Sequence, residues 1–318
     1  MSRRVIPTDA TRSEVRFPVT SSGEHCTATL HLPAVSGTAA KPPLVVMAHG
    51  LGAVRDMGLR MYAERFAADG YACLVFDYRH FGTSDGSPRH LVSVTSQLAD
   101  WTAALAYARG LEQADGDRLI AWGTSLGGGH VISTAARRPA GLVAAIAQCP
   151  FTDGIASALA MSRVTALKVS LAAARDLALA RYGSEPYMIA VAGPRHSEAL
   201  TTAPDAEAGY LSLVPAGCDF RNEVPARAVF DILRYRPGRE APRIDVPVLF
   251  SVCERDFVAP PGPTLRYAEQ APRAEIRTYP AGHFDIYSGE AFERVVADQL
   301  DFLRRHVPAA PETARTPA

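Results

Sequence analysis

The sequence has no long uninterrupted apolar run. No segment approaches the roughly 18 consecutive apolar residues that a membrane-spanning helix needs. The N-terminal stretch MSRRVIPTDATRSEV contains arginines, but no apolar stretch of the kind found in a signal peptide follows them. We therefore expect a cytoplasmic protein without a membrane span.

An excess of charge of either sign is also missing. The 318 residues include 33 Lys and Arg and 33 Asp and Glu, so the formal net charge is zero. A balanced chain has no overall field that would attract nucleic acid or anionic lipid. The composition favours a small-molecule substrate, predicts no nucleic-acid partner, and leaves a homo-oligomer open.

Cysteine is scarce, with five residues, an odd number. Cys73, Cys149 and Cys253 lie in or beside apolar, strand-like runs, where cysteine usually serves as a small buried hydrophobic residue. The pattern favours free thiols over a disulfide framework and is typical of a reducing compartment.

Short apolar runs alternate with segments of helical periodicity. Because their hydrophobicity is continuous, both faces of each strand should be covered, as in a parallel sheet between helices. The sequence therefore predicts an α/β fold with a mostly parallel central sheet flanked by helices. The runs are residues 44–48, 72–76, 119–122, 142–147 and 248–252, and the first helix should bury Leu59, Tyr62, Ala63 and Phe66.

Two regions depart from this alternation. Before the first run, EVRFPV and CTATLHL predict a β-hairpin at an antiparallel edge of the sheet. After residue 150 the strands stop, and helical segments enclose a loop-like stretch rich in Pro and Gly until the strand pattern resumes. We predict a largely helical cap or lid inserted into a core. The boundaries are 1–150 and 243–307 for the core, 151–242 for the cap, and 308–318 for a disordered tail.

The segment GTSLGG, residues 123–128, follows one apolar run and leads into a helix. A strand that turns into a helix within one residue strains that residue, and the residues two positions away must be small. Gly123 and Gly127 occupy these positions around Ser125. Gly-x-Ser-x-Gly is typical of a nucleophile elbow, which presents its serine at the carboxyl edge of the sheet.

Other glycine-rich motifs fit this segment less well. A dinucleotide fingerprint needs glycine where Ser125 stands, and a phosphate-binding loop needs Lys and Ser or Thr where the chain has Gly129 and His130. The motif by itself leaves a second interpretation open, namely a glycine-rich turn whose serine has no catalytic role.

A nucleophilic serine needs a histidine base and an orienting carboxylate, which follow it in the order acid, then histidine. VLFSVCERD ends at Asp256, and His283 follows the next strand-like segment in PAGHFD. We predict Ser125, Asp256 and His283 as the catalytic residues. Glu254 is the alternative acid, and Asp285 should instead cap the helix that begins near residue 289.

Attack on a carbonyl places negative charge on its oxygen, which requires hydrogen-bond donors already in position. We expect the backbone N–H groups of Leu126, directly after Ser125, and of Leu51, in the glycine-flanked loop after residue 48. His49 should support this loop. Asp77 and Arg79, in FDYRHFGTSDG, are interpreted as a polar turn stabilised by an internal ion pair.

Taken together, HGLG, FDYRHFGTSDG, GTSLGG, CERDFVAP and PAGHFD resemble motifs of the α/β-hydrolase superfamily, nearest to its dienelactone-hydrolase-like and prolyl-oligopeptidase-like bacterial members. The resemblance covers residues 12–150 and 243–307. It implies hydrolysis of esters, thioesters or amides through an acyl-enzyme, with no cofactor and no metal. The nucleophile is serine rather than cysteine and no propeller domain is present, so lactone and peptide specificity do not transfer.

The favoured function is a serine carboxylesterase with a hydrophobic acyl or alcohol pocket. Other chemistry on the same three residues stays open: thioesterase, amidase or peptidase, acyltransferase or C–C bond hydrolase activity. A non-catalytic ligand-binding protein also stays open. Apolar side chains of the predicted cap should supply apolar surface, namely Leu159, Met161, Leu167, Leu171, Tyr187, Met188, Leu211, Leu213, Phe220 and Phe230.

Overall fold

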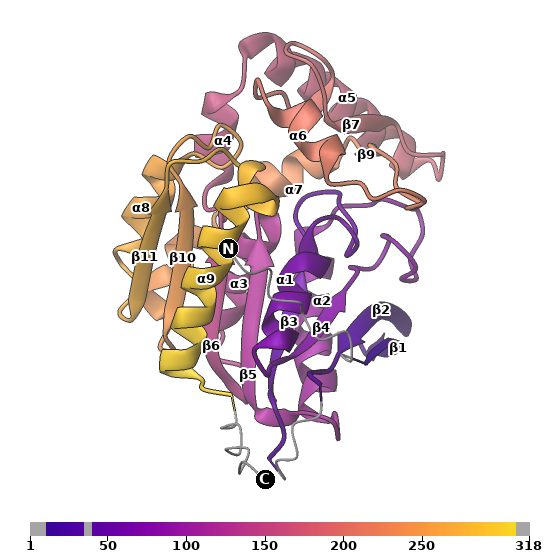
Figure 1. The fold of residues 1–318 in the computed structure, drawn as a ribbon. Helices are drawn as coiled ribbons and strands as arrows, with labels where there is room; N and C mark the ends of the chain where they lie inside the picture. The colour runs from indigo at the N-terminus through magenta and orange to yellow at the C-terminus, as the bar shows by residue number, and fades with distance from the viewer. Residues whose placement is uncertain (1–10, 35–39, 310–318) are drawn as a thin grey trace, which may run out of the picture.

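Figure 1 shows the computed structural model of the chain, which describes residues 11–34 and 40–309. Most of the predicted tail, residues 310–318, lies outside the described residues, as do residues 1–10 of the N-terminal stretch. Within the described ranges, no helix is long and apolar enough to cross a membrane.

An eight-stranded sheet forms the centre of the molecule. Its strands are β1 Arg12–Val19, β2 Glu24–His31, β3 Pro43–Ala48, β4 Ala72–Phe76, β5 Asp115–Thr124, β6 Leu142–Gln148, β10 Val248–Cys253 and β11 Ala274–Tyr279. They follow the order β1-β2-β4-β3-β5-β6-β10-β11. β1 and β2 form the predicted antiparallel hairpin, β2 pairs antiparallel with β4, and the remaining neighbours are parallel. The predicted fold class is confirmed.

Helices cover both faces of this sheet (Figure 1). Alternate residues of each strand point to opposite faces, so Val46 of β3 belongs to one core cluster and its neighbour Val45 to the other. All four residues expected on the buried face of the first helix are buried. The Val45 side packs against α1 Leu59–Ala68 and α9 Gly289–His306, and the Val46 side against α2 Val94–Arg109, α3 Leu126–Ala136 and α8 Pro261–Ala268.

We call residues 151–242, between β6 and β10, the inserted segment. Its helices are α4 Gly154–Ala160, α5 Arg163–Arg181, α6 Ala206–Ser212, α7 Ala228–Arg234 and the 3-10 helix η1 Pro237–Arg243. Its strands are β7 Met188–Ala192, β8 Ala199–Thr201 and β9 Val224–Pro225. Its α5, α6, β7 and β9 lie above the upper edge of the central sheet in Figure 1, whereas its last part packs against α3 and α8 on one face of the sheet.

The three strands of the inserted segment form a second sheet in the order β8-β7-β9. β7 and β8 lie where the sequence predicted a loop, and β9 lies at the start of a segment predicted to be helical. The side-chain oxygen of Asn222 accepts the backbone N–H groups of Val191 and Ala192 at 3.1 and 3.0 Å, so a side chain replaces part of a strand ladder. The strands are too short for an alternating pattern to be visible in the sequence. The division of the chain into core and cap stays a prediction.

The five cysteines are free thiols, and Cys73, Cys149 and Cys253 are buried within the strands or directly beside them. The expectation of buried, unpaired cysteines is confirmed.

Candidate active site

Ser125 lies at the turn between β5 and α3, with φ 56° and ψ −121°. Positive φ is unfavourable for a residue with a side chain, so the surrounding packing must hold it. A Cβ atom on Gly123 would lie 2.2 Å from the carbonyl oxygen of Gly127, and one on Gly127 would lie 2.5 Å from the carbonyl oxygen of His49. Only glycine fits at either position, as the sequence predicted.

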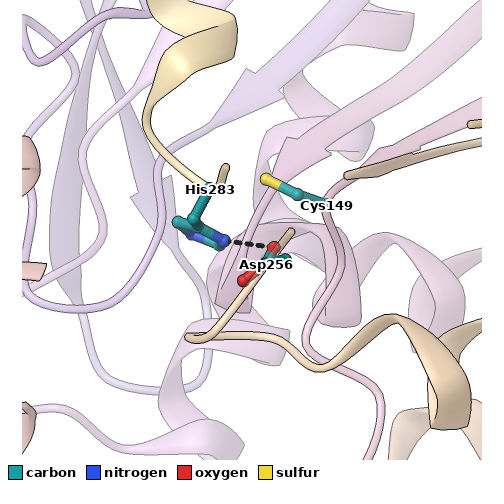
Figure 2. Close-up of side chains that lie close together, drawn as sticks. All are labelled: Cys149, Asp256 and His283. Carbon is teal, nitrogen blue, oxygen red and sulfur yellow. Dashed lines mark hydrogen bonds and ion pairs between the residues drawn. The ribbon is translucent and has the colours of Figure 1, made fainter. Parts of the chain in front are cut away.

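The structure brings the three predicted side chains together. Nε2 of His283 lies 3.1 Å from Oγ of Ser125, and Nδ1 lies 2.6 Å from Oδ2 of Asp256. The other carboxylate oxygen of Asp256 accepts the backbone N–H groups of Val258 and Ala259 at 2.8 and 2.7 Å. This carboxylate is therefore fixed by its own loop and can orient the imidazole ring (Figure 2).

Burial and charge act in opposite directions on His283. Removal from water by itself lowers the pKa of His283, because a charged imidazolium loses its hydration. The negative charge of Asp256 and hydrogen bonding to it favour the protonated ring, and the resulting pKa lies well above the usual 6.5. Such an imidazole holds a proton strongly once it has accepted one.

Two other carboxylates near His283 form no hydrogen bond or ion pair with its ring in the described structure. Glu254, the alternative acid, is exposed on the rim of the cavity. Asp285 does not cap α9, contrary to expectation. Its carboxylate accepts the backbone N–H of Gly282 at 2.7 Å, and the residue at the N-cap of α9 is Ser288. The reason is proximity, because Asp285 lies in the short turn that carries His283.

Cys149, at the end of β6, is a neighbour of this pair that the sequence reasoning missed. Its Sγ, a ring nitrogen of His283 and a carboxylate oxygen of Asp256 all lie within 4.8 Å of one another (Figure 2). Zinc accepts thiolate, imidazole and carboxylate donors. A bound ion would first have to break the 2.6 Å contact between His283 and Asp256. The three side chains therefore fit a set of hydrogen-bonded groups better than the ligands of a resident metal. The predicted lack of a metal stays a prediction.

The loop after β3 passes directly beside Ser125. A Cβ atom on Gly50 would lie 3.0 Å from the Cβ of Ser125. Leu126 is the first residue of α3, so its N–H has no acceptor within the helix. Leu51 and Leu126 line the same cavity as Ser125. Their backbone N–H groups stay our predicted oxyanion donors.

This loop is held from both sides. His49 is fully buried, and its Nδ1 lies 2.9 Å from the carbonyl oxygen of Gly50, in line with the expected supporting role. From the inserted segment, the hydroxyl of Tyr210 donates to the carbonyl oxygen of Leu51 at 2.9 Å. Tyr210 was missed because its partner lies 159 positions away, and no local pattern reports such a contact.

The expected ion pair within FDYRHFGTSDG is wrong, although the hydroxyl of Ser84 does donate to the carbonyl oxygen of Asp77 inside the turn. Asp77 accepts the backbone N–H and the guanidinium of Arg55 at 2.6 and 2.8 Å, whereas Arg79 pairs with Asp100 of α2 at 2.5 Å. Each side chain reaches a buried partner on a different element, which satisfies its charge better than a contact within one turn. Asp77 therefore ties the loop after β3 to the end of β4.

A cavity of about 1280 Å³ opens at Ser125 and His283, between the carboxyl edge of the sheet and the inserted segment. Of the ten apolar residues expected to supply apolar surface in the inserted segment, Met161 and Leu213 line it. Three of the others, one on α4 and two on α5, do not line it, and α5 turns only one side toward the cavity. Leu159, Leu167 and Leu171 are 82, 62 and 64% exposed.

The fold and this arrangement define an α/β-hydrolase of the serine hydrolase class. Residues 40–288 match the family described as Serine aminopeptidase, S33, and the chain belongs to this family.

Similar proteins extend over nearly the whole chain. Quorum-quenching protein AidA of Acinetobacter baumannii (strain MDR-ZJ06) is 53% identical, covering 91% of this chain and 93% of that protein. Thiohydrolase aneE of Aspergillus aculeatus is 24% identical over 93% of this chain and 94% of its own. Among solved structures, the complex of DcsB with its substrate analogue matches with a TM-score of 0.80 and 23% identity, covering 93% of this chain and 99% of that one. Est1E of Butyrivibrio proteoclasticus with bound ferulic acid matches with a TM-score of 0.62 and 19% identity, covering 92% of this chain and 99% of that one.

Proposed function

We propose that this protein is a serine hydrolase that cleaves a carboxylic ester with an apolar acyl or alcohol group. The observation that carries the proposal is the chain of contacts from Ser125 Oγ to His283 Nε2 at 3.1 Å and from His283 Nδ1 to Asp256 Oδ2 at 2.6 Å. This is the relationship that a nucleophile, its base and an orienting acid require.

The reaction proceeds in two halves. His283 accepts the hydroxyl proton of Ser125 as Oγ attacks the ester carbonyl, and Asp256 stabilises the imidazolium. The N–H groups of Leu51 and Leu126 receive the developing oxyanion, and one such donor is worth about 2.7–4 kcal/mol in the transition state. The imidazolium then protonates the departing alcohol. Water, activated by the same imidazole, hydrolyses the acyl-Ser125 ester.

The cavity supports a substrate with substantial apolar surface. Its volume of about 1280 Å³ exceeds the range of roughly 300–1,000 Å³ that is common for small-molecule sites. Phe151, Val169 and Leu213 are among its lining residues. The 53% identity with a protein named for quorum quenching supports a small signal molecule as the substrate. A cytoplasmic location belongs to the same proposal.

Two measurements test this function. A fluorophosphonate probe should label the wild-type protein and not Ser125→Ala, while Ser157→Ala, a serine elsewhere in the cavity, should label normally. Across p-nitrophenyl esters from acetyl to dodecanoyl, kcat/KM should increase with acyl length. Failure to label would leave a non-catalytic ligand-binding protein, and highest activity on acetyl esters would contradict an apolar acyl pocket.

Acyl transfer or thioester cleavage is the second candidate, favoured by the names of more distant relatives. Besides Thiohydrolase aneE, the chain is 26% identical to Polyketide transferase ATR5 of Stachybotrys chlorohalonatus over 83% of this chain and 89% of that one. The same acyl-enzyme would then form from a thioester or pass to an alcohol. Product analysis with competing alcohols, and a comparison of matched ester and thioester substrates, separates these reactions.

A further inference from the structure

The consecutive helices α4 and α5 carry five exposed apolar side chains. Leu159, Leu167 and Leu171 are 82, 62 and 64% exposed, and Val164 and Ile155 are 49 and 44% exposed. On α5, residues 164, 167 and 171 follow a spacing of three and four, so they share one face of the helix. We call these five residues the α4–α5 ridge. Large exposed apolar groups that share one helix face, as the three on α5 do, mark interaction surfaces.

The longer of these helices, α5, concentrates positive charge, whereas α4 carries no charged residue. Residues 154–181 contain four basic side chains and one acidic side chain, although the whole chain is neutral. The acidic one, Asp176, is buried against Arg227 at 2.8 Å and does not offset the outer charges. No ion pair among the described residues involves the four basic side chains, which are Arg163, Lys168, Arg175 and Arg181.

The ridge lies next to the proposed active site. On its inner side, α5 lines the cavity with Ala166, Val169 and Ser170. Phe257, directly after Asp256, also lines the cavity and is 63% exposed. An apolar surface bound to the ridge would therefore lie close to the cavity rim.

We propose that the α4–α5 ridge docks the protein on an anionic lipid surface. Exposed leucines beside arginine and lysine are the combination that binds the boundary between acyl chains and headgroups. The apolar side chains enter that boundary, and the basic side chains pair with lipid phosphates. A second copy of the chain is a poorer occupant, because symmetric contact through this ridge would bring the basic groups of both copies together.

Sedimentation with vesicles tests the proposal. Vesicles of phosphatidylcholine with about 30% phosphatidylglycerol should bind the full-length protein, and pure phosphatidylcholine vesicles should bind it at least about fivefold less. Leu167→Ser combined with Leu171→Ser should weaken binding to the anionic vesicles by about tenfold or more. Arg163→Gln combined with Arg181→Gln should weaken it by a similar factor. Met61→Ser, which alters a 40% exposed methionine on α1, is the matched control and should bind like the wild type.

Vesicle binding and ester hydrolysis can fail independently of each other in these experiments. Ser125→Ala should bind vesicles as the wild type does, and the leucine variant should keep its kcat/KM on a soluble ester, which also shows that it folds. The proposal is overturned by lack of binding to anionic vesicles, or by equal binding of the wild type and the leucine variant. It is likewise overturned if the wild type forms a dimer that the leucine substitutions dissociate, which would assign the ridge to a second copy.

Discussion

The hydroxyl of Tyr210, in α6, donates a hydrogen bond to the carbonyl oxygen of Leu51 at 2.9 Å. This carbonyl and the N–H of Leu51, our proposed oxyanion donor, belong to the two peptide groups on either side of the same Cα atom. A side chain of the inserted segment thus fixes the orientation of a loop of the central sheet beside Ser125.

Tyr210→Phe removes this hydrogen bond and leaves the buried ring in place. We expect kcat to fall about tenfold while KM changes little, since the donor acts on the transition state and a misaligned donor forfeits part of its contribution. Steady-state kinetics on a soluble ester gives both constants. The control is Tyr182→Phe, which alters an 83% exposed tyrosine in the same segment. A change in KM alone would argue against a role in positioning the oxyanion loop.

Asp256→Asn should lower kcat by about 10³–10⁴-fold, because an amide in place of the carboxylate favours the wrong tautomer of His283 and cannot stabilise the imidazolium. The asparagine oxygen can still accept the N–H groups of Val258 and Ala259, so the loop should keep its shape. Glu254→Gln serves as the control and tests the alternative acid. Activity lost in Glu254→Gln and kept in Asp256→Asn would transfer the role to Glu254.

The pH profile should depend on His283. The neutral imidazole accepts the proton from Ser125, so kcat/KM is lost as pH falls through the pKa of His283. Because Asp256 holds this pKa above its usual 6.5, we expect the acidic limb of the profile to have its inflection above pH 6.5. In Asp256→Asn, the rate of fluorophosphonate labelling should show an inflection at lower pH. An unshifted inflection would mean that Asp256 does not set this pKa.

Gly127→Ala should destabilise the fold. An added Cβ would lie 2.5 Å from the carbonyl oxygen of His49, so backbone must move, at a cost of about 1–3 kcal/mol. Gly262→Ala, in α8, is the matched control, because its added Cβ meets its nearest neighbour at 4.0 Å. Urea denaturation followed by circular dichroism compares the free energies of unfolding. Equal stability of the two variants would contradict the tight packing at the elbow.

Much of the fold and the composition of the site follow from local patterns in the sequence. Continuous apolar runs identified β3 to β6 and β10, and glycine spacing identified the turn at Ser125. Asp256 and His283 could be predicted to lie near Ser125 because each follows a strand, and parallel strands end at one edge of the sheet. Local patterns are sufficient where one element determines the position of a residue.

Local sequence patterns could not predict contacts between segments that are distant in the chain. The partners of Asp77 and Arg79 lie on other elements, so a turn that looks self-contained in the sequence is tied to two neighbours. The small sheet of the inserted segment has strands of two to five residues, too short to show a period of two. Likewise, the helical pattern of α5 gave no indication of which side would face the cavity.

The two sides of α5 restrict how this helix can change during evolution. One inserted or deleted residue would rotate the rest of the helix by about 100° and exchange cavity-lining positions with outer ones. Substitutions on one side can alter substrate preference while the other side is unaffected. Changes in length are therefore expected in the turns that flank α5, and relatives should preserve the number of residues within it.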